Sequence, residues 1–314
     1  MPLDRQAARF LGMLAAGGQS AGGMGAGYGP ARERRQGLTD LASWTAGDPP
    51  AVGAVRDDAL PGPAGPIPIR LYTPLDAGSG PLPGMVFFHG GGWVAGDLET
   101  HDGVCRRLAN ASGCRLIAVD YRLAPEHPFP AGYDDAFAAI RAIAVQAEDL
   151  GVDPMRLGVA GDSAGAGLAA AVCLAARADG PALAFQLLIC PILDMAEESA
   201  SRIELAEGHF LDQATLERDL ALYAPPDRAD PRVSPLRAGD LTGLPPAFIH
   251  TAEFDPFRDE GLAYARRLAE AGVSVTETCH EGLIHYFYAM PRVITRAEAA
   301  LAEMGSEIAR RLAG

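Results

Sequence analysis

Residue patterns for metal or disulfide chemistry are missing from this sequence of 314 residues. The five cysteines are scattered, odd in number, and include no Cys-x-x-Cys pair. They therefore predict neither a disulfide framework nor a zinc site, and most are expected to be small buried hydrophobes. None of the seven histidines belongs to a His-Glu-x-x-His pattern or a similar ligand set, so we expect no metal site.

Long apolar runs and an excess of basic residues are also absent. No stretch of about 18 or more apolar residues occurs, so we expect no membrane span. The 26 basic residues are outnumbered by 40 acidic ones, which gives a net charge of −14. A chain this acidic repels nucleic acid and anionic membrane surfaces. With 48% hydrophobic residues, which suffice for a core, the composition indicates a soluble enzyme that acts on uncharged substrates.

The N-terminal segment, residues 1–18, resembles a signal peptide only faintly. Arg5 and Arg9 precede a short apolar run, but Asp4 interrupts the charged region. Apolar residues recur at the spacing of one helix face, namely Ala7, Phe10, Leu11 and Leu14. We therefore expect an amphipathic helix that forms part of a cap, and a cytoplasmic rather than a secreted protein.

The sequence Gly-Asp-Ser-Ala-Gly at residues 161–165 is the most informative feature present. It follows an apolar run and precedes an Ala- and Leu-rich segment that is typical of a helix, residues 164–178. A strand that turns sharply into a helix through Gly-x-Ser-x-Gly forms a nucleophile elbow, which exposes the serine hydroxyl above a sheet. Gly161 and Gly165 provide the space that such a tight turn needs. Ser163 is therefore the candidate nucleophile, although a Gly/Ser loop could produce the same pattern by chance.

An acyl-transfer serine of this kind needs a carboxylate and a base, which follow it in that chain order. The candidate carboxylate is Asp255, which comes just after the strand-like segment 246–252. Glu253 is an alternative that lies even closer to the strand end. Asp259 is a second alternative, but it is expected to fall within the following helix as a solvated or capping residue.

The candidate base is His285, which follows the alternating segment 273–279. With an unperturbed pKa of about 6.5, an imidazole can take the serine proton at neutral pH and return it to the leaving group. His280 is a rival that lies closer to the predicted strand. His285 could also be a packed loop histidine without a catalytic role.

The segment His-Gly-Gly-Gly-Trp at residues 89–93 follows another strand-like run. Glycines let the backbone approach a substrate closely and aim N–H groups at it, and a loop of this type contributes to the oxyanion hole of lipases and esterases. We expect donors from Gly90 and Gly91, and a third from Ala164, the residue after the nucleophile. A phosphate cradle is the alternative, but the chain lacks a Gly-x-x-x-x-Gly-Lys-[Ser/Thr] pattern.

Strand-like and helix-like segments alternate along the chain. The expected strands are residues 67–72, 85–88, 116–120, 156–160, 185–190, 247–251 and 273–279. The expected helices are residues 101–111, 131–150, 164–178, 256–271 and 292–312. This order predicts an α/β fold with a mostly parallel central sheet and helices on both faces. Residues 19–30, 61–66 and 78–84 are expected to form a flexible loop, a turn-rich stretch and a hairpin-like loop.

The segment 195–230 interrupts this alternation with a helical pattern. An insertion at this point would lie over Ser163, and together with residues 1–45 it is expected to form a cap that excludes water. The core would then comprise two parts, residues 46–194 and 231–314. The candidate wall residues of the pocket, each of which could pack within the cap instead, are Met13, Phe210, Leu211, Leu216 and Tyr223. A surface excursion without substrate contact is the alternative.

Four motifs stand in a characteristic order, at residues 89–93, 121–131, 161–165 and 255–260. Together they resemble the bacterial hormone-sensitive-lipase-like carboxylesterases of the α/β-hydrolase superfamily, over nearly the whole chain. The resemblance implies the α/β-hydrolase fold with a helical cap. It also implies Ser163 as nucleophile, Asp255 as acid and His285 as base, with oxyanion donors from Gly90, Gly91 and Ala164.

Two residues depart from the pattern of this family. Phe257 stands where leucine is usual, and Tyr286 stands where glycine is usual. Tyr286 is expected to narrow the pocket wall and so to affect substrate size more than catalysis. Asp162 is expected to hydrogen-bond neighbouring loops. The expected substrate-binding residues are Trp93, Asp162, Phe210, Leu211 and Tyr286.

The resulting hypothesis is a serine carboxylesterase that forms an acyl-enzyme intermediate, and the resemblance implies short- to medium-chain acyl esters. Its partner is a small-molecule ester, and the mechanism needs no metal or organic cofactor. A deacetylase, lactonase or amidase with the same triad is the first alternative. A non-catalytic small-molecule receptor is the second, but such relatives generally lose a triad member and all three are retained here. A homodimer is compatible with the sequence.

Overall fold

An eight-stranded sheet forms the centre of the computed structural model, which describes residues 2–16 and 31–313. The spatial order of its strands is β1-β2-β4-β3-β5-β6-β7-β8. Their bounds are β1 Ala54–Gly62, β2 Gly65–Thr73, β3 Leu82–Phe88, β4 Arg115–Val119, β5 Val152–Asp162, β6 Gln186–Ile189, β7 Ala247–Phe254 and β8 Val275–Ile284. β2 is antiparallel to β1 and β4, and every pair from β4 to β8 is parallel. The predicted mostly parallel sheet is confirmed.

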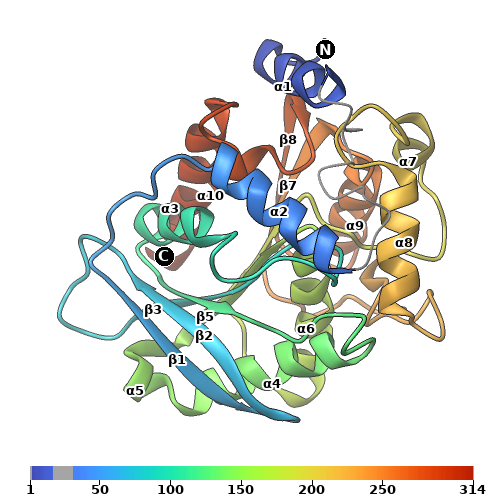
Figure 1. The fold of residues 1–314 in the computed structure, drawn as a ribbon. Coiled ribbons are helices and arrows are strands. Elements are labelled where there is room, and N and C mark those ends of the chain that lie inside the picture. The colour runs from blue at the N-terminus through green and yellow to red at the C-terminus, as the bar shows by residue number, and fades with distance from the viewer. Residues whose placement is uncertain (1, 17–30, 314) are drawn as a thin grey trace.

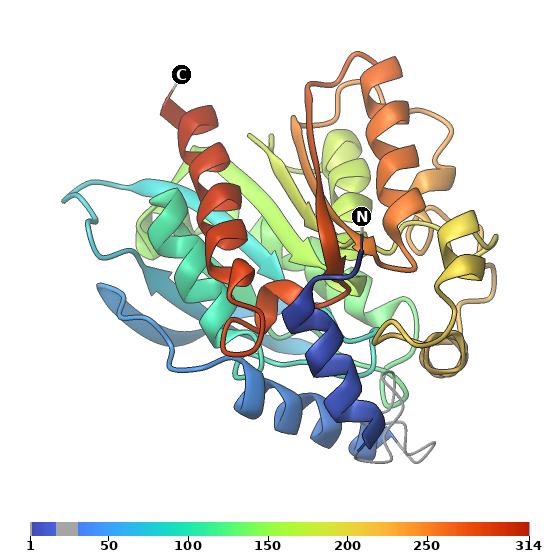
Figure 2. The ribbon, with the colours of Figure 1, turned by 90° about the horizontal axis from the view of Figure 1, so that it is seen from above.

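Helices cover both faces of the sheet (Figures 1 and 2). One face carries α3 (Asp102–Ser112) and α10 (Arg296–Ala313), which pack against each other. The other face carries α4 (Ala131–Val145), α6 (Ala164–Asp179) and α9 (Arg258–Glu270). A short helix, α5 (Ala147–Leu150), leads into β5. The fold is therefore the three-layered α/β arrangement that the alternation predicted.

The strand β3 shows how a central strand contributes to two apolar cores. Val86 and Phe88 join the core beneath α4, α6 and α9, whereas Met85 and Phe87 join the core beneath α3 and α10. All four side chains are fully buried. A strand that is buried on both faces is a continuous apolar run in the sequence, which explains why this element could be predicted.

Helices from two distant parts of the chain lie beyond the carboxyl ends of the parallel strands (Figure 1). Their bounds are α1 Arg5–Ala16, α2 Ala31–Thr45, α7 Ala200–Glu204 and α8 Gln213–Tyr223. Helix α1 buries Ala7, Phe10 and Leu14, as its amphipathic pattern predicted. The helical pattern of segment 195–230 corresponds to α7 and α8. The division of the chain into a cap and a two-part core stays a prediction.

Three local expectations differ from the structure. The turn-rich stretch at 61–66 is the tip of a hairpin between β1 and β2, in which Gly62 pairs with Gly65. The edge strand β1 was not predicted, because most of its residues are exposed. The hairpin-like loop at 78–84 was wrong, because β2 pairs with β4 rather than with β3. The helix expected at 131–150 breaks at Gln146. The loop expected at 19–30 lies outside the described residues.

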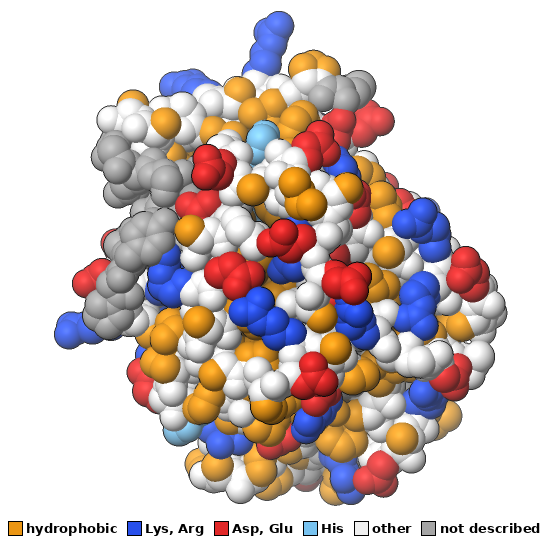
Figure 3. All heavy atoms as spheres, turned by 90° about the vertical axis from the view of Figure 1, so that its right-hand side faces the viewer, with side chains coloured by type: hydrophobic (Ala, Val, Ile, Leu, Met, Phe, Trp, Pro, Cys, Tyr) orange, Lys and Arg blue, Asp and Glu red, His pale blue; other side chains and the backbone are white. Residues whose placement is uncertain are grey.

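The molecular surface carries both signs of charge. On the described part of the face in Figure 3, acidic and arginine side chains alternate and do not gather into a basic patch. This distribution accords with the net charge of −14. Within the described ranges, no helix is both long and apolar enough to cross a membrane.

Candidate active site

Ser163 lies at a sharp turn between β5, which ends at Asp162, and α6, which begins at Ala164. Its backbone φ is 52°, in the left-handed region that side chains rarely adopt. The flanking glycines are required sterically: a Cβ at Gly161 would lie 2.4 Å from the Gly165 oxygen, and one at Gly165 would lie 2.0 Å from the Phe88 oxygen. The predicted strand–turn–helix geometry is therefore present, and it directs the Ser163 side chain away from the sheet.

The side chains of Ser163, His285 and Asp255 form a continuous hydrogen-bonded line. His285 Nε2 lies 3.0 Å from Ser163 Oγ, and His285 Nδ1 lies 2.8 Å from Asp255 Oδ2. A carboxylate can only accept hydrogen bonds, so His285 Nδ1 carries the proton. His285 Nε2 is therefore free to accept a hydrogen bond from the Ser163 hydroxyl. The Phe257 N–H donates to Asp255 Oδ1 over 2.8 Å and fixes the carboxylate. All three side chains are buried.

The rival residues bond to other partners. Glu253 accepts a hydrogen bond from the Gly282 N–H at 2.7 Å, and Asp259 accepts one from the Ser201 N–H at 2.9 Å. His280 Nε2 lies 3.2 Å from Nδ1 of His250. Burial lowers the pKa of His280 to about 3, so its imidazole stays neutral. The structure thus brings Asp255 and His285, rather than these three residues, to Ser163.

The glycine loop after β3 lies beside Ser163, but its N–H groups have different partners. Gly90, an expected oxyanion donor, instead donates its N–H to Asp162 Oδ1 at 2.9 Å, and that expectation was wrong. Gly91 and Gly92 line the cavity that contains Ser163. The N–H groups of Gly91, Gly92 and Ala164 donate to no described residue. They are the donors that this geometry leaves available.

Asp162 holds the glycine loop in place. Besides the Gly90 N–H, it accepts a 2.7 Å hydrogen bond from the Tyr288 hydroxyl, and His101 Nε2 lies 3.4 Å away. Burial disfavours the charged carboxylate, but His101, Tyr288 and Gly90 together outweigh that effect and lower its pKa. The expectation that Asp162 bonds to neighbouring loops is confirmed by these contacts.

The cavity above Ser163 is walled by both parts of the proposed cap. Four of the expected substrate-binding residues line it, namely Asp162, Phe210, Leu211 and Tyr286. Trp93 does not line it and instead stacks on Tyr223, with ring centroids 4.6 Å apart. Of the further candidate wall residues, Leu216 lines the cavity, whereas Met13 is 41% exposed and lies outside its lining. Trp93 and Tyr223 therefore pack against each other and do not belong to the cavity lining.

Several lining residues were missed at the sequence level, including Arg34, Leu38, Leu41, Ile192, Thr215 and Asp219. Arg34, Leu38 and Leu41 are spaced i, i+4 and i+7, which places them on one face of α2. That spacing could have revealed the face. Nothing in the sequence indicated that this face of α2 would meet α8 across Ser163.

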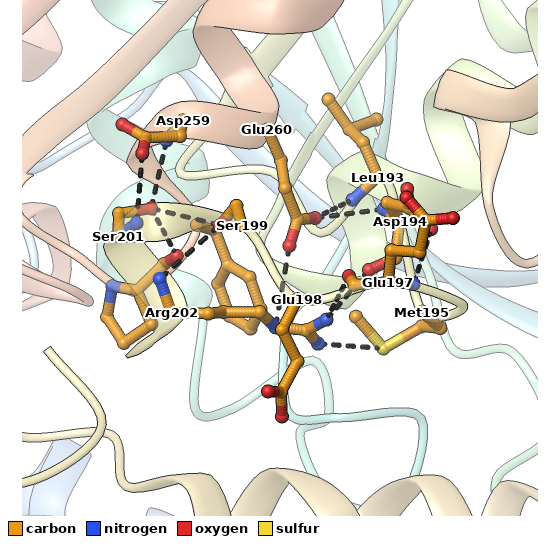
Figure 4. A network of polar contacts seen from close by, with 12 residues as sticks. Leu193, Asp194, Met195, Glu197, Glu198, Ser199, Ser201, Arg202, Asp259 and Glu260 are labelled. Atoms are coloured by element: carbon orange, nitrogen blue, oxygen red, sulfur yellow. Dashed lines mark hydrogen bonds and ion pairs between the residues drawn. The ribbon is translucent and has the colours of Figure 1, made fainter. Parts of the chain in front are cut away.

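Polar contacts fasten the start of the insertion to α9 (Figure 4). Glu260 Oε2 accepts hydrogen bonds from the backbone N–H groups of Leu193 and Asp194, at 2.8 and 2.9 Å. Arg202 Nε lies 3.5 Å from Glu260 Oε1. Burial raises the pKa of Glu260 to about 8 despite the opposing charge of Arg202. Glu260 follows Asp255 closely in the chain, so these contacts connect the segment after the candidate acid to the start of the insertion.

One group of possible metal ligands occurs among the described residues, formed by Cys190, Asp255 and His285. Burial raises the pKa of the Cys190 thiol well above its usual value. A protonated thiol is a poor ligand, and the facing atoms of Asp255 and His285 already share a hydrogen bond. The group is therefore suited to proton transfer rather than to metal binding. Four of the five cysteines are buried, which confirms the expectation that most of them are buried.

Comparisons with known proteins identify the family. Residues 85–289 match the family described as the alpha/beta hydrolase fold. The carboxylic ester hydrolase LipN of Mycobacterium tuberculosis is 43% identical over 242 residues, and the match covers 74% of this chain and 64% of LipN. An ethyl acetate hydrolase of Pseudomonas putida is 41% identical over 244 residues, covering 75% of this chain and 76% of its own.

A solved structure is similar over the whole chain. An ester hydrolase from the metagenome of Lake Arreo, in complex with a bipyridine phosphonate derivative, superposes with a TM-score of 0.95. The two proteins are 44% identical, and the match covers 99% of this chain and 100% of the other. The chain therefore belongs to the hormone-sensitive-lipase-like carboxylesterases of the α/β-hydrolase superfamily.

Proposed function

We propose that the protein hydrolyses carboxylic esters through Ser163, His285 and Asp255. The observation that carries this proposal is the hydrogen-bonded line between them, with contacts of 3.0 and 2.8 Å. His285 takes the Oγ proton as Ser163 attacks the ester carbonyl, and Asp255 stabilises the resulting imidazolium. The proton then passes to the leaving alcohol. Water attacks the acyl-enzyme by the same route, which releases the acid and restores Ser163.

The tetrahedral intermediate needs N–H donors in front of Ser163. We assign this role to Gly91, Gly92 and Ala164, because the first two line the cavity and the third opens α6 directly after the nucleophile. A donor of this kind is worth about 10²–10³ in kcat. The Gly90 N–H would act indirectly, through its bond to Asp162. Apart from the ester and the attacking water, the proposed steps use only side chains and backbone groups of the protein.

The proposed substrates are uncharged esters with short to medium acyl chains. Much of the cavity lining is apolar, including Leu38, Leu41, Ile192 and Leu216, and would bind an acyl or alkyl chain. The relative from Pseudomonas putida is named for ethyl acetate, an ester with a small acyl group. That name supports the short end of the range.

A cytoplasmic location and a homodimer stay predictions from the sequence. Light scattering coupled to gel filtration would measure the mass in solution against the 32.8 kDa of one chain. A mass of one chain would contradict the dimer.

An alkyl p-nitrophenyl phosphonate tests the proposed nucleophile directly. Attack by Ser163 would release p-nitrophenol and leave the phosphonyl group on Oγ. We expect peptide mass spectrometry to find the modification on Ser163, and we expect Ser163→Ala to release no burst of p-nitrophenol. The matched control is Ser306→Ala on α10, which should label like the wild type. Labelling that persists in Ser163→Ala would contradict the proposal.

A further inference from the structure

One wall of the cavity above Ser163 is polar. Arg34 reaches it from α2 and Asp219 reaches it from α8, and Arg34 Nε lies 3.2 Å from Asp219 Oδ2. The two side chains are 15% and 3% exposed, so the ion pair is largely removed from water. An ion pair in a largely apolar pocket is costly unless its remaining hydrogen-bonding atoms are also satisfied.

Those remaining atoms are not satisfied within the described residues. Asp219 Oδ1 is buried and has no hydrogen-bond partner. Tyr286 lines the same cavity, and its hydroxyl is also buried without a hydrogen-bond partner among the described residues. Arg34 makes one hydrogen bond, through Nε, and its terminal nitrogens bond to no described group. Buried polar atoms are normally paired, so an unpartnered carboxylate oxygen and an unpartnered hydroxyl on two residues that line one cavity point to a ligand that completes them.

The position of Asp219 places this polar wall beside the glycine loop. A Cβ at Gly92 would lie 2.2 Å from Asp219 Oδ2, so the missing side chain makes room for the carboxylate. The charge of Arg34 also acts on Tyr286: burial raises the pKa of that phenol, and Arg34 opposes the rise. Arg34, Asp219 and Tyr286 line the same cavity as Gly91 and Gly92, two of the proposed oxyanion donors.

We propose that Arg34, Asp219 and Tyr286 form a subsite for a hydroxyl group carried by the ester substrate. A hydroxyl can donate to Asp219 Oδ1 while it accepts from Arg34 or Tyr286, and it matches all three groups. The Arg34–Asp219 pair has no net charge, so a carboxylate or ammonium on the substrate would bring an unmatched charge into the pocket. The inference rests on the proposed esterase function and predicts that hydroxylated esters are preferred among its substrates.

A purely mechanical role for the ion pair makes a different prediction. The pair joins α2 to α8, so its loss could loosen the cap and change stability and all ester activities together. A hydroxyl subsite instead controls the ratio of activities on a hydroxylated ester and its plain counterpart. That ratio is insensitive to the amount of folded enzyme, because both substrates are measured on the same preparation.

The test compares kcat/KM for three substrate pairs. On the acyl side these are p-nitrophenyl hexanoate with its 3-hydroxy and its 6-hydroxy analogues, and on the alcohol side propyl butyrate with glycerol monobutyrate. We expect the ratio of hydroxylated to plain ester in at least one pair to fall about tenfold or more in Asp219→Leu, the loss expected for a hydrogen bond to a charged group. Tyr286→Phe, which removes only the hydroxyl, should lower the ratio in the same pair.

Asp179→Leu is the matched control, because Asp179 forms an exposed ion pair with Arg141 away from the cavity. It should keep the wild-type ratio. Equal ratios in wild type, Asp219→Leu and Tyr286→Phe for every pair would overturn the subsite. Failure of the proposed function would look different, because the wild type would hydrolyse neither member of any pair.

Measurements of ligand binding distinguish failure of the hydroxyl subsite from failure of the proposed esterase function. In calorimetric titrations of Ser163→Ala with glycerol monobutyrate and propyl butyrate, turnover plays no part. The subsite predicts tighter binding of the glycerol ester and loss of that preference when Asp219→Leu is added. The same preference with and without Asp219→Leu would overturn the inference, whatever the catalytic result.

Discussion

Tyr286 has a backbone φ of 66°, in the region where glycine is strongly favoured. Its ring lines the cavity and stacks on Phe210, with centroids 6.0 Å apart. Tyr286→Gly would remove the ring and suit this backbone, so we expect the chain-length preference to move towards longer acyl groups. The measurement is kcat/KM over esters from acetyl to palmitoyl. An unchanged profile would show that Tyr286 does not limit the pocket.

Asp255 orients His285 through a 2.8 Å contact and is fully buried. Asp255→Asn would favour the wrong imidazole tautomer and leave the imidazolium unsupported, so we expect kcat to fall by up to about 10⁴ without loss of the fold. Circular dichroism checks the fold. Asp259→Asn is the matched control, since Asp259 bonds to Ser201 instead of His285. Activity of Asp255→Asn within a few-fold of wild type would refute its assignment.

The glycine loop illustrates how one element depends on another. Asp162, at the end of β5, anchors the loop after β3 through the Gly90 N–H. Asp162→Ala would let the loop shift, and a displacement of about 1 Å in a catalytic group can cost about 10² in rate. We expect kcat to fall by about that factor and KM to change less. Asp162→Asn, which keeps an acceptor for Gly90, should recover part of the loss.

Wild-type kcat in Asp162→Ala would show that the loop holds its shape without this bond. A rise of about 10² in KM with unchanged kcat would instead indicate that Asp162 contributes to substrate binding. The ratio of the two parameters therefore distinguishes positioning of the oxyanion donors from a direct contact with substrate.

The contact between α9 and the insertion predicts a pH dependence of stability. Burial raises the pKa of Glu260 from 4.5 to about 8, so the folded protein binds a proton more tightly than the unfolded chain. The associated stability is present below pH 4.5 and is lost as the pH rises through about 8. The glutamine side chain of Glu260→Gln does not titrate, so this variant lacks the contribution of Glu260 to the pH dependence. We therefore expect the free energy of unfolding of wild type, relative to Glu260→Gln, to decrease over that range.

Urea unfolding at a series of pH values measures this difference. Comparison with the variant cancels the contributions of groups that both proteins share, including His89 and His280. A wild-type stability that is flat or rises relative to Glu260→Gln across the same range would contradict the account of this contact.

For the whole molecule, the features predicted from the sequence were those encoded locally. Buried strands such as β3 are apolar runs, and the turn at Ser163 is marked by its flanking glycines. The parallel register then brings the ends of β7 and β8, with Asp255 and His285 just beyond them, to the edge where β5 ends. Asp255 and His285 could be predicted from two local features, namely their positions after strand-like segments and the chain order of serine, acid and histidine.

Features that depend on tertiary contacts were not predicted. The hydrogen bond from the Gly90 N–H to Asp162 depends on the orientation of the Asp162 side chain, which no sequence motif encodes. Arg34 and Asp219 are 185 positions apart and meet only because α2 and α8 converge over the cavity. Strand β1 was not predicted, because an exposed edge strand shows little alternation of apolar and polar residues. Trp93, placed in the pocket from its motif, packs on Tyr223 instead.

The central claim is that Ser163 performs ester hydrolysis in a pocket that is lined largely by apolar side chains. The most direct measurement is the hydrolysis of a p-nitrophenyl ester series, from acetyl to palmitoyl, by wild type and Ser163→Ala in parallel. We predict strong activity that peaks at short to medium chains in the wild type and is abolished in Ser163→Ala. Equal activity in the two proteins, or none on any ester from folded wild type, would contradict the account.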